Sequence, residues 1–430
     1  MANLQYPQDS WIGAVPAEWA ILPAKALFSN PVERNHPEDV HLTPSQKHGV
    51  IPQAEYMEIT GSRVVLNLSG ADNMRHVEPG DYISHLRSFQ GGLEYSAFKG
   101  KVSSAYTVLR PKRAIDPRFY KFLFKSSRYI QGLSTTTEQL RDGQSIRYEQ
   151  FALLPLPYPP LEHQKAIADF LDAELAGMDN LTQKQLELIA RLRERKNALI
   201  KEKILGLTNS SAASTGGNFD WLTGIPSEWP ITKIGREFTL TLGKTLNAAT
   251  NQGERIVPYL RAGNIQDTGI DLSEVKTIAV TAKEMHDLTL NTGDVVVVEG
   301  GAGFGRSDIL TSPLDGWVFQ NHVIRARALG TTPPEYLDLY IKYLRSIGHF
   351  EKLSAYATIP SISSESLGKI PIPKPPREVA KEIANSLNNG LKKHDELIGK
   401  SSQLIQALQE RRAALISGAV TGKIDVRGKN

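Results

Sequence analysis

The sequence predicts an α+β protein in which two globular heads of mixed helix and strand are separated by a long antiparallel coiled coil, with an internal pseudo-twofold repeat. Two observations predict this class. A set of landmarks occurs twice, in the same order, along the 430 residues. Each set ends in a long segment with heptad periodicity. We therefore expect two similar modules, each made of a globular head followed by a helical shaft.

The spacing between matched landmarks separates head from shaft. The opening Trp11 to Trp19 returns as Trp221 to Trp229, 210 residues later, and Gly80-Asp81 returns as Gly293-Asp294 after 213. From Pro155 onward the spacing is a constant 216. Surface loops absorb length changes easily, whereas packed periodic helices do not. The heads are therefore expected to differ and the shafts to be alike. The constant spacing joins Pro155 to Pro371, Leu171 to Leu387, Leu192 to Leu408 and Gly206 to Gly422.

The expected domains follow from turn and breaker residues. The first head mixes β-rich runs at Arg63 to Leu68 and Val102 to Leu109 with one helical segment near Pro117 to Tyr129. The proline cluster from Pro155 to Pro160 cannot lie inside a helix, so it separates head from shaft. The expected boundaries are a first head at 1–155, a first helix at 156–206, a flexible linker at 207–219, a second head at 220–372 and a second helix with its tail at 373–430.

Each shaft carries an apolar seam with heptad spacing. We expect the two shafts to pack on each other as an antiparallel strut; the alternative is that each covers its own head. A small polar residue and an arginine interrupt both seams at the same places, a pattern that fixes register. The expected seam positions are Leu171, Met178, Gln185, Leu192 and Leu199 with Leu181, Leu188 and Arg195 in the first shaft, and Leu387, His394, Ser401, Leu408 and Leu415 with Leu397, Leu404 and Arg411 in the second.

Composition excludes several classes of protein. The chain has no cysteine, which removes disulfides, thiolate nucleophiles and cysteine-ligated metals. It has neither an apolar run of about 18 residues nor a signal-peptide pattern, so we expect a cytoplasmic protein. Between His85 and Gln150 there are 12 Lys or Arg against 5 Asp or Glu. Such a local excess suits a polyanion, although many basic faces are simply solvated.

No catalytic motif is found. The glycines from Gly300 to Gly305 miss the G-x-G-x-x-G spacing, and Gly243-Lys244-Thr245 lacks the first glycine of a P-loop. The sequence has no His-Glu-x-x-His and no Asn-Pro-Pro-Tyr or Asp-Pro-Pro-Tyr tetrapeptide of the adenine methyltransferase kind. We therefore expect no cofactor, no metal and no enzyme activity on this chain.

Polar segments at matching places in both heads are the candidate binding regions. Arginine pairs with guanine, Asn or Gln with adenine, and Ser or Thr with phosphate oxygens. The alternative for each segment alone is an ordinary polar loop. The candidate DNA contacts are Arg87, Gln90, Lys99, Lys101, Thr136, Gln139, Arg141, Gln144 and Arg147 in the first head, and Arg261, Asn264, Arg306, Asn321, His322, Tyr356, Thr358 and Ser361 in the second.

These residues give the chain a resemblance to the specificity subunits of type I restriction-modification systems, the HsdS family. It covers almost the whole length. Its carriers are the Trp-x-x-x-x-Pro-x-x-Trp openings, the two Gly-Asp pairs, and the proline-rich hinge that runs through Leu161-Glu162-His163-Gln164 into the first shaft. The second hinge departs from the pattern, because Arg377-Glu378-Val379-Ala380 stands where Leu-Glu-x-Gln is expected.

The resemblance implies two target recognition domains, each reading one half of an asymmetric bipartite site in double-stranded DNA, with the shafts fixing the gap. It also implies that two modification subunits dock on the shafts and bring S-adenosylmethionine and adenine methylation, while restriction subunits, where they exist, add ATP-driven cleavage. Two other classes stay open. One is a scaffold with two protein-binding heads on a helical rod, and the other is a DNA-modifying enzyme in its own right.

Overall fold

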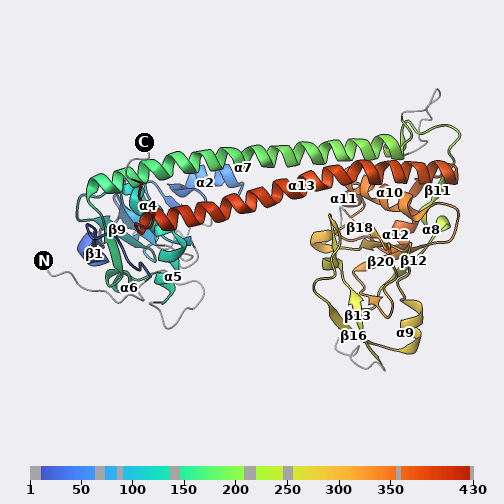
Figure 1. Ribbon diagram of the computed structural model, residues 1–430, viewed down its shortest axis with the longest axis horizontal. Coiled ribbons are helices and arrows are strands. Elements are labelled where there is room, and N and C mark those ends of the chain that lie inside the picture. Colours follow the sequence, from blue (N-terminus) through green and yellow to red (C-terminus); the bar gives the residue numbers. More distant parts are fainter. Residues whose placement is uncertain are drawn as a thin grey trace. The chain divides into compact units, whose positions relative to one another are not determined.

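The computed structural model describes residues 11–62, 73–84, 91–135, 146–207, 219–245, 255–354 and 360–426. The chain divides into two compact units, one made of Met1–Gln185 with Gln403–Asn430 and the other of Leu186–Ser402. Each unit combines one head with parts of two long helices, α7 (Leu161–Ile204) and α13 (Arg377–Val420). Figure 1 shows the mixed helices and strands of each head. The predicted α+β class is confirmed.

The first head is built on a four-stranded antiparallel sheet with the order β2-β9-β6-β7. Three antiparallel pairs, β1-β10, β3-β4 and β5-β8, flank it. Its strands are β1 (Ala20–Pro23), β2 (Phe28–Ser29), β3 (Leu42–Ser45), β4 (Gly49–Pro52), β5 (Arg75–Val77), β6 (Tyr82–Ser84), β7 (Glu94–Tyr95), β8 (Gly100–Val102), β9 (Thr107–Pro111) and β10 (Pro155–Tyr158). Its helices are α1 (Ala24–Leu27), α2 (Gln53–Thr60), α4 (Pro117–Lys125), α5 (Ser127–Thr135) and α6 (Tyr148–Ala152).

Helix α4 explains why the core of this head is aromatic. Asp116 caps its first turn by accepting hydrogen bonds from the backbone N–H groups of Arg118 and Phe119, and Pro117 suits the first helical position. The buried face carries aromatic rings that pack edge-on against Phe28 and Tyr82 of the sheet. The expected helical segment near Pro117 to Tyr129 is therefore present, but it is divided into α4 and α5 at Ser126.

The second head repeats the central sheet. Strands in the order β12-β20-β17-β18 pair antiparallel, as their counterparts do in the first head. A three-stranded sheet β16-β13-β19 and the pairs β14-β15 and β11-β21 complete it. The strands are β11 (Ile231–Lys233), β12 (Phe238–Leu242), β13 (Arg255–Leu260), β14 (Ile265–Gln266), β15 (Gly269–Ile270), β16 (Lys276–Val280), β17 (Val295–Val298), β18 (Ser307–Ile309), β19 (Val318–Phe319), β20 (Val323–Ala328) and β21 (Pro371–Pro373). The helices are α8 (Ile234–Glu237), α9 (Ala282–Asp287), α10 (Pro334–Ser346), α11 (His349–Leu353) and α12 (Ser364–Lys369), with 3-10 turns η2 (Asp220–Leu222), η4 (Ala262–Asn264) and η5 (Gly301–Gly303).

The repeated Gly-Asp landmark holds the two central strands of each sheet together. The buried carboxylate of Asp81 accepts two hydrogen bonds from Arg110 on β9, at 2.8 and 2.9 Å. Asp294 accepts the equivalent pair from Arg327 on β20, both at 2.7 Å. Each carboxylate also accepts a backbone N–H three residues earlier, from Glu78 or Asn291, which closes the turn before the strand. A bidentate guanidinium matches a carboxylate in geometry as well as charge, so the motif is structural.

The first hinge differs from expectation in one respect. Its prolines do not simply break the chain, because Pro155–Tyr158 forms strand β10, which pairs with β1. A two-stranded ribbon has only edge strands, where proline is tolerated. Gln164 then anchors α7: its side chain donates to the carbonyl of Pro159 and accepts from the backbone N–H of Asp116, the cap of α4. The equivalent residue of the second hinge is the buried Ala380, so that cap is absent there.

The two long helices lie inside the segments 156–206 and 373–430 that the sequence assigned to the shafts, although the start of the first segment belongs to strand β10. Helices α7 and α13 are each 44 residues long and begin at Leu161 and Arg377. Both end in the same way. The N–H of Leu207 bonds to the carbonyl of Glu202, and that of Lys423 to the carbonyl of Gly418, while Gly206 and Gly422 adopt positive φ. This is the Schellman ending, in which glycine relieves the left-handed conformation.

Two ion pairs define how α7 and α13 lie against each other. Asp179 pairs with Arg412 within the first unit, and Lys196 pairs with Asp395 at 2.7 Å within the second. In both pairs the residue numbers add to 591, which is the relation of one antiparallel register. The predicted antiparallel pairing is therefore observed. Each shaft also covers part of its own head, since Leu171 and Met178 of α7 join the core of the first head and Leu387 of α13 joins that of the second.

One half of the predicted seam is wrong. The first set lies on the packed side of each helix, from the buried Leu171 and Met178 of α7 to the buried Leu387 and Ser401 of α13. The complementary set lies four residues after each of these positions rather than three, as at Leu175, Ile189, Leu391 and Ala419. The residues assigned three positions on are therefore corrected, since Leu181, Leu188, Leu397 and Leu404 are 37, 40, 47 and 38% exposed, and Arg195 and Arg411 are exposed as well.

The remaining seam positions are partly buried. A heptad offers both a three-residue and a four-residue step between its apolar positions. The sequence has leucines three residues after the first set, which favoured the three-residue spacing. In the structure, the isoleucines four residues after the first set face the interface instead. The partly buried members of the first set are Gln185, Leu192, Leu199, His394, Leu408 and Leu415.

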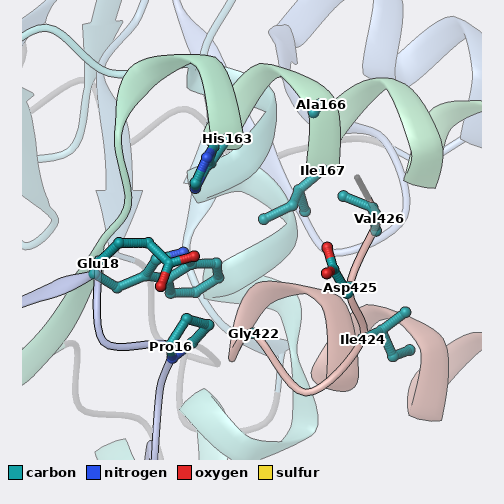
Figure 2. Close-up of a pocket in the computed structure, with 10 residues that line it drawn as sticks. Pro16, Glu18, His163, Ala166, Ile167, Gly422, Ile424, Asp425 and Val426 are labelled. Carbon is teal, nitrogen blue, oxygen red and sulfur yellow. The ribbon is translucent and has the colours of Figure 1, made fainter. Parts of the chain in front are cut away.

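The segment that follows α13 belongs to the first head. Gly422 packs on Pro16 and Trp19, as Gly206 packs on Pro226 and Trp229 in the second unit. Figure 2 shows this junction: Ile424, Asp425 and Val426 line a small pocket of about 40 Å³ together with Pro16, Glu18 and His163. The buried ends of α13, Ala419 and Val420, join the core of the first head.

The two shaft-ending glycines give a matched pair of predictions. A Cβ at position 422 would lie 2.3 Å from Pro16 and one at position 206 would lie 2.8 Å from Trp229, both at positive φ. We expect Gly422→Ala to lower the free energy of unfolding of the first unit, and Gly206→Ala that of the second, each by about 1–3 kcal/mol. Hydrogen exchange resolved by mass spectrometry checks which head loses protection. Gly390→Ala, where a Cβ meets nothing within 4 Å, is the control. It should raise the free energy of unfolding by about 1 kcal/mol or less, because alanine favours a helix interior over glycine. Loss of protection in the second head of Gly422→Ala would contradict the assignment.

The corrected seam gives a second prediction. Ile189 is 7% exposed and its neighbour Leu188 is 40% exposed. Ile189→Ala should lower the free energy of unfolding by about 2–4 kcal/mol, because it empties a packed position. Leu188→Ala, the control, should cost less than about 1 kcal/mol. Urea unfolding measures both losses of stability. A larger loss for Leu188→Ala than for Ile189→Ala would show that the seam uses the three-residue spacing.

Candidate nucleic-acid interface

Nine of the seventeen candidate DNA contacts lie within the described residues, and eight lie outside them. The eight are Arg87, Gln90, Thr136, Gln139, Arg141 and Gln144 of the first head and Tyr356 and Thr358 of the second. The nine are Lys99, Lys101, Arg147, Arg261, Asn264, Arg306, Asn321, His322 and Ser361.

In the first head, the residues that flank two candidate segments are in contact. The hydroxyl of Ser84, at the end of β6, accepts a hydrogen bond from the N–H of Ile146 at 3.0 Å and lies 3.3 Å from its carbonyl. Thr107 of β9 donates to the same carbonyl at 2.7 Å. The chain therefore brings the end of the segment before Arg147 to the end of the central strand. Arg147 itself is exposed and begins helix α6.

The second head has the same constellation. The N–H of Ile362 donates to the carbonyl of Glu299, just after β17, and Gly300 pairs with Ser361 as an isolated bridge. Ile362 lies 216 residues after Ile146, so the two isoleucines are equivalent in the repeat. In both heads the described end of the second candidate segment, at Ile146 or at Ser361 and Ile362, thus lies against the end of the strand that precedes the first candidate segment. The sequence predicted the two segments but not their contact.

A third segment joins this surface in the second head. The N–H of Glu299 donates to the carbonyl of His322, and the side chains of these residues meet at 3.2 Å. Asn321 donates its N–H to the carbonyl of Lys244. His322 is half exposed and Asn321 partly exposed. Amide and imidazole groups on a turn can reach base edges, so Ser361, Asn321 and His322 form one polar surface, which we name the β17 edge.

Gly243-Lys244 supports the β17 edge. A Cβ at position 243 would lie 2.3 Å from the carbonyl oxygen of Gln320, so only glycine allows this approach. The side chain of Lys244 is nearly buried and pairs with Glu284 at 2.6 Å. Hydrogen bonds from Lys244 and from the backbone of Thr281 hold the pKa of Glu284 below its ordinary value. The Gly-Lys pair that resembles a P-loop is therefore needed for packing: Gly243 allows the close approach to Gln320, and Lys244 forms an ion pair with Glu284 of α9.

Two further candidates have structural roles. Asn264 is buried, accepts the N–H of Arg261 at 3.0 Å and donates to the carbonyl of Asp271 at 2.7 Å. It shapes the η4 turn, so its assignment as a DNA contact is corrected. Arg261 pairs with Glu274 at 2.5 Å and is 24% exposed. A turn glycine beside Arg and Asn suggested a segment that contacts bases, but the amide of Asn264 forms its hydrogen bonds within the protein.

In the first head, Lys99 and Lys101 lie beside a buried histidine. His76 contacts Asp39 at 2.7 Å through Nδ1 and Glu78 at 2.8 Å through Nε2. Burial opposes protonation of His76, but its hydrogen bonds to the two carboxylates outweigh burial and raise the pKa of the imidazole. Lys99 lies 4.0 Å from Glu78 and is half exposed. Lys101, on β8, is partly exposed. Both lysines can reach a polyanion.

Arg306 and its surroundings contain a residue that the sequence did not indicate. Arg306 donates to Gln266 at 3.2 Å and lies 3.4 Å from Asp267, which also pairs with Arg345 at 2.5 Å. Arg345 is in the last turn of α10, where a basic residue is commonplace. Nothing in the sequence distinguishes it from other helix-ending arginines.

The part of the chain that the structure covers contains no group of three or more His, Asp or Glu side chains placed to hold a metal ion. Among the same residues, no helix is both long and apolar enough to cross a membrane.

The chain is similar to a protein family, to individual specificity subunits and to a solved structure. The model of the type I restriction modification DNA specificity domain matches residues 42–191 and 226–408, one match in each head and its following helix. The putative type I restriction enzyme MjaX specificity subunit of Methanocaldococcus jannaschii is 24% identical over 445 residues, which covers 97% of this chain and 96% of that protein. The type I restriction enzyme EcoKI specificity subunit of Escherichia coli (strain K12) is 26% identical over 239 residues, or 54% of this chain and 49% of that protein.

This chain therefore spans about half the length of the EcoKI protein that it matches. Among solved structures, a chain from work on complex assembly and conformational transition of the type I R-M system has a TM-score of 0.66 at 15% identity, covering 96% of this chain and 100% of that one. This likeness concerns the fold. With a family match in both halves that covers more than half of the residues, the chain belongs to the family of type I restriction-modification DNA specificity subunits.

Proposed function

We propose that each head reads one half of an asymmetric bipartite DNA sequence. The observation that carries this proposal is the repeated position of Ile146 and Ile362, whose N–H groups bond to Ser84 and Glu299 at the corresponding strand ends of two sheets with the same topology. The scaffold repeats, but the side chains presented differ: the exposed residue that follows the isoleucine and precedes a short helix is Arg147 in one head and Ser363 in the other. Different polar groups on one scaffold suit two different sequences.

Helices α7 and α13 are proposed to set the gap between the two half-sites. Their single register and their buried seam favour a stiff pair. The exposed leucines at 181, 188, 397 and 404 leave apolar surface on the outside of that pair. We assign this surface to the docking of two modification subunits, which would bring S-adenosylmethionine and the active site for adenine methylation. Restriction subunits, where they exist, would add ATP-driven cleavage, and this chain would determine which DNA sequence the complex recognises.

A scaffold that binds two proteins is the competing function. DNA recognition requires binding that falls steeply with salt and depends on sequence once the modification subunits are present. A scaffold would show neither property. An enzyme acting alone would bind S-adenosylmethionine as the isolated chain, which calorimetry would detect.

The β17 edge predicts a change confined to one half-site. Asn321→Ala removes an amide of the kind that pairs with adenine, so we expect about 1–3 kcal/mol less discrimination at one base of the half-site read by the second head. Sequencing of methylated adenines in cells with the modification subunit checks this. His286→Ala, an exposed change on α9 of the same head, is the control and should leave the methylated sequence unchanged. Equal relaxation of both half-sites would contradict separate readers.

The register of the helices predicts a change in the gap alone. Deleting residues 182–188 together with 403–409 removes one heptad from each helix and keeps the sum of 591 between facing residues. The pair becomes about 10 Å shorter at 1.5 Å per residue, or about three base pairs at 3.4 Å each. We expect methylome sequencing to find the same two half-sites with a shorter gap. A constant gap would refute the role of the helices, and deletion of 182–188 alone should abolish activity because it breaks the register.

A further inference from the structure

Two arginines from different parts of the second unit contact one carboxylate, and a third acts on it by its charge. Arg345 of α10 donates to Asp267 at 2.5 Å, and Arg306, between η5 and β18, approaches the other oxygen of Asp267 at 3.4 Å. Arg306 also donates to the side chain of Gln266 at 3.2 Å. The charge of Arg193, on α7, also favours the ionised form of Asp267. We name this group, Arg193, Arg306, Arg345 and Asp267, the Asp267 cluster.

The Asp267 cluster has more positive than negative charge. Burial opposes ionisation of Asp267, but the hydrogen bond from Arg345 and the charges of Arg345, Arg306 and Arg193 outweigh it and hold the pKa of the carboxyl below its ordinary value. Asp267 is therefore ionised at neutral pH. Three guanidinium groups against one carboxylate leave an excess of two positive charges.

The cluster is accessible. The side chain of Arg345 is 34% exposed and that of Arg306 is 24% exposed, while Asp267 is 58% exposed. The charged groups are thus held in place by one another and still reach solvent. A planar guanidinium presents its N–H donors in a fork that matches phosphate oxygens, which a lysine cannot do.

The position of the cluster favours DNA over other anions. Arg306 follows the η5 turn, and its N–H bonds to the carbonyl of Gly303. The same turn begins at Gly300, which pairs with Ser361 of the β17 edge. The cluster is therefore continuous with the surface proposed to read bases, and through Arg193 it also reaches the helix proposed to span the gap. Backbone phosphates next to a half-site lie at such a boundary.

We propose that Arg306 and Arg345 bind a phosphate of the DNA backbone beside the half-site read by the second head, with Arg193 adding positive charge and Asp267 as an internal counter-ion that orients the two guanidiniums before DNA arrives. This inference rests on the proposed function. It changes the role expected of Arg306, from a reader of bases to a residue that fixes the position of the duplex. Phosphate contacts set register and carry no sequence information themselves.

The test is the salt dependence of DNA binding by the full chain assembled with its modification subunits. Fluorescence anisotropy would compare a cognate duplex with one whose second half-site is scrambled, between 50 and 200 mM salt. Arg345→Gln should weaken binding to both duplexes by the same factor, about five- to tenfold, and reduce the slope of log K against log salt by about 1, because one phosphate contact is lost. The ratio between the two duplexes should stay unchanged. Arg236→Gln, an exposed arginine on α8, is the matched control and should alter neither quantity.

Asp267→Asn separates this proposal from a structural network. Removing the internal counter-ion frees the guanidiniums, so binding to both duplexes should strengthen and its salt slope should not decrease. If the cluster only holds the head together, Asp267→Asn and Arg345→Gln will both lower the melting temperature while the salt slope of each stays that of the parent, and the proposal is overturned. Weaker assembly of Arg345→Gln with modification subunits, with normal DNA binding once assembled, would assign the cluster to an acidic protein segment and also overturn it. Failure of the proposed function is distinct, because the parent complex would then not distinguish the two duplexes at all.

Discussion

The buried seam between α7 and α13 is the interaction on which the rest of the structure depends. Each helix has 44 residues, and in isolation it would expose an apolar stripe along its whole length. Pairing covers that stripe together with the heads, whose cores include Leu171 and Leu387. The two ion pairs, Asp179 with Arg412 and Lys196 with Asp395, agree on one register. Because a heptad seam allows no gradual sliding, any function that needs a defined distance along the helices can rely on it.

The antiparallel seam also explains which helix end completes each head. The end of α7 packs on the second head, and the end of α13 packs on the first head. In the second unit, Gly206 ends α7 and packs on Trp229, shortly after it in the sequence. In the first unit the same contact joins Gly422 to Trp19, from opposite ends of the chain. The local chemistry is the same, since a left-handed glycine packs on Pro-x-x-Trp, although the chain connections differ. The tail is therefore part of the first head's core and not an appendage.

The features set by local sequence could be predicted, and those set by distant partners could not. Heptads, the proline hinges and the ending glycines located the shafts, because helix periodicity and breakers act over a few residues. The order of the strands depends on pairing between segments tens of residues apart, which no short pattern records. The choice between a three- and a four-residue step at Leu188 and Ile189 depended on which side chain the opposing helix accepts. In the candidate site, Asn264 and Arg345 show the same limit, since an amide or a guanidinium has the same sequence appearance whether it faces a carbonyl, a carboxylate or DNA.

We propose that one fixed helix register holds two readers at a defined separation on DNA. Because the chain has no cysteine, pairs can be introduced at will: Asp179→Cys with Arg412→Cys, and Lys196→Cys with Asp395→Cys, each joined by a short bismaleimide. The account predicts that both pairs cross-link efficiently, that Asp179→Cys with Asp395→Cys does not, and that the doubly cross-linked protein still directs methylation to the same two half-sites with the same gap. Efficient linkage of the mismatched pair, or a methylated site whose gap changes when the helices are locked together, would contradict it.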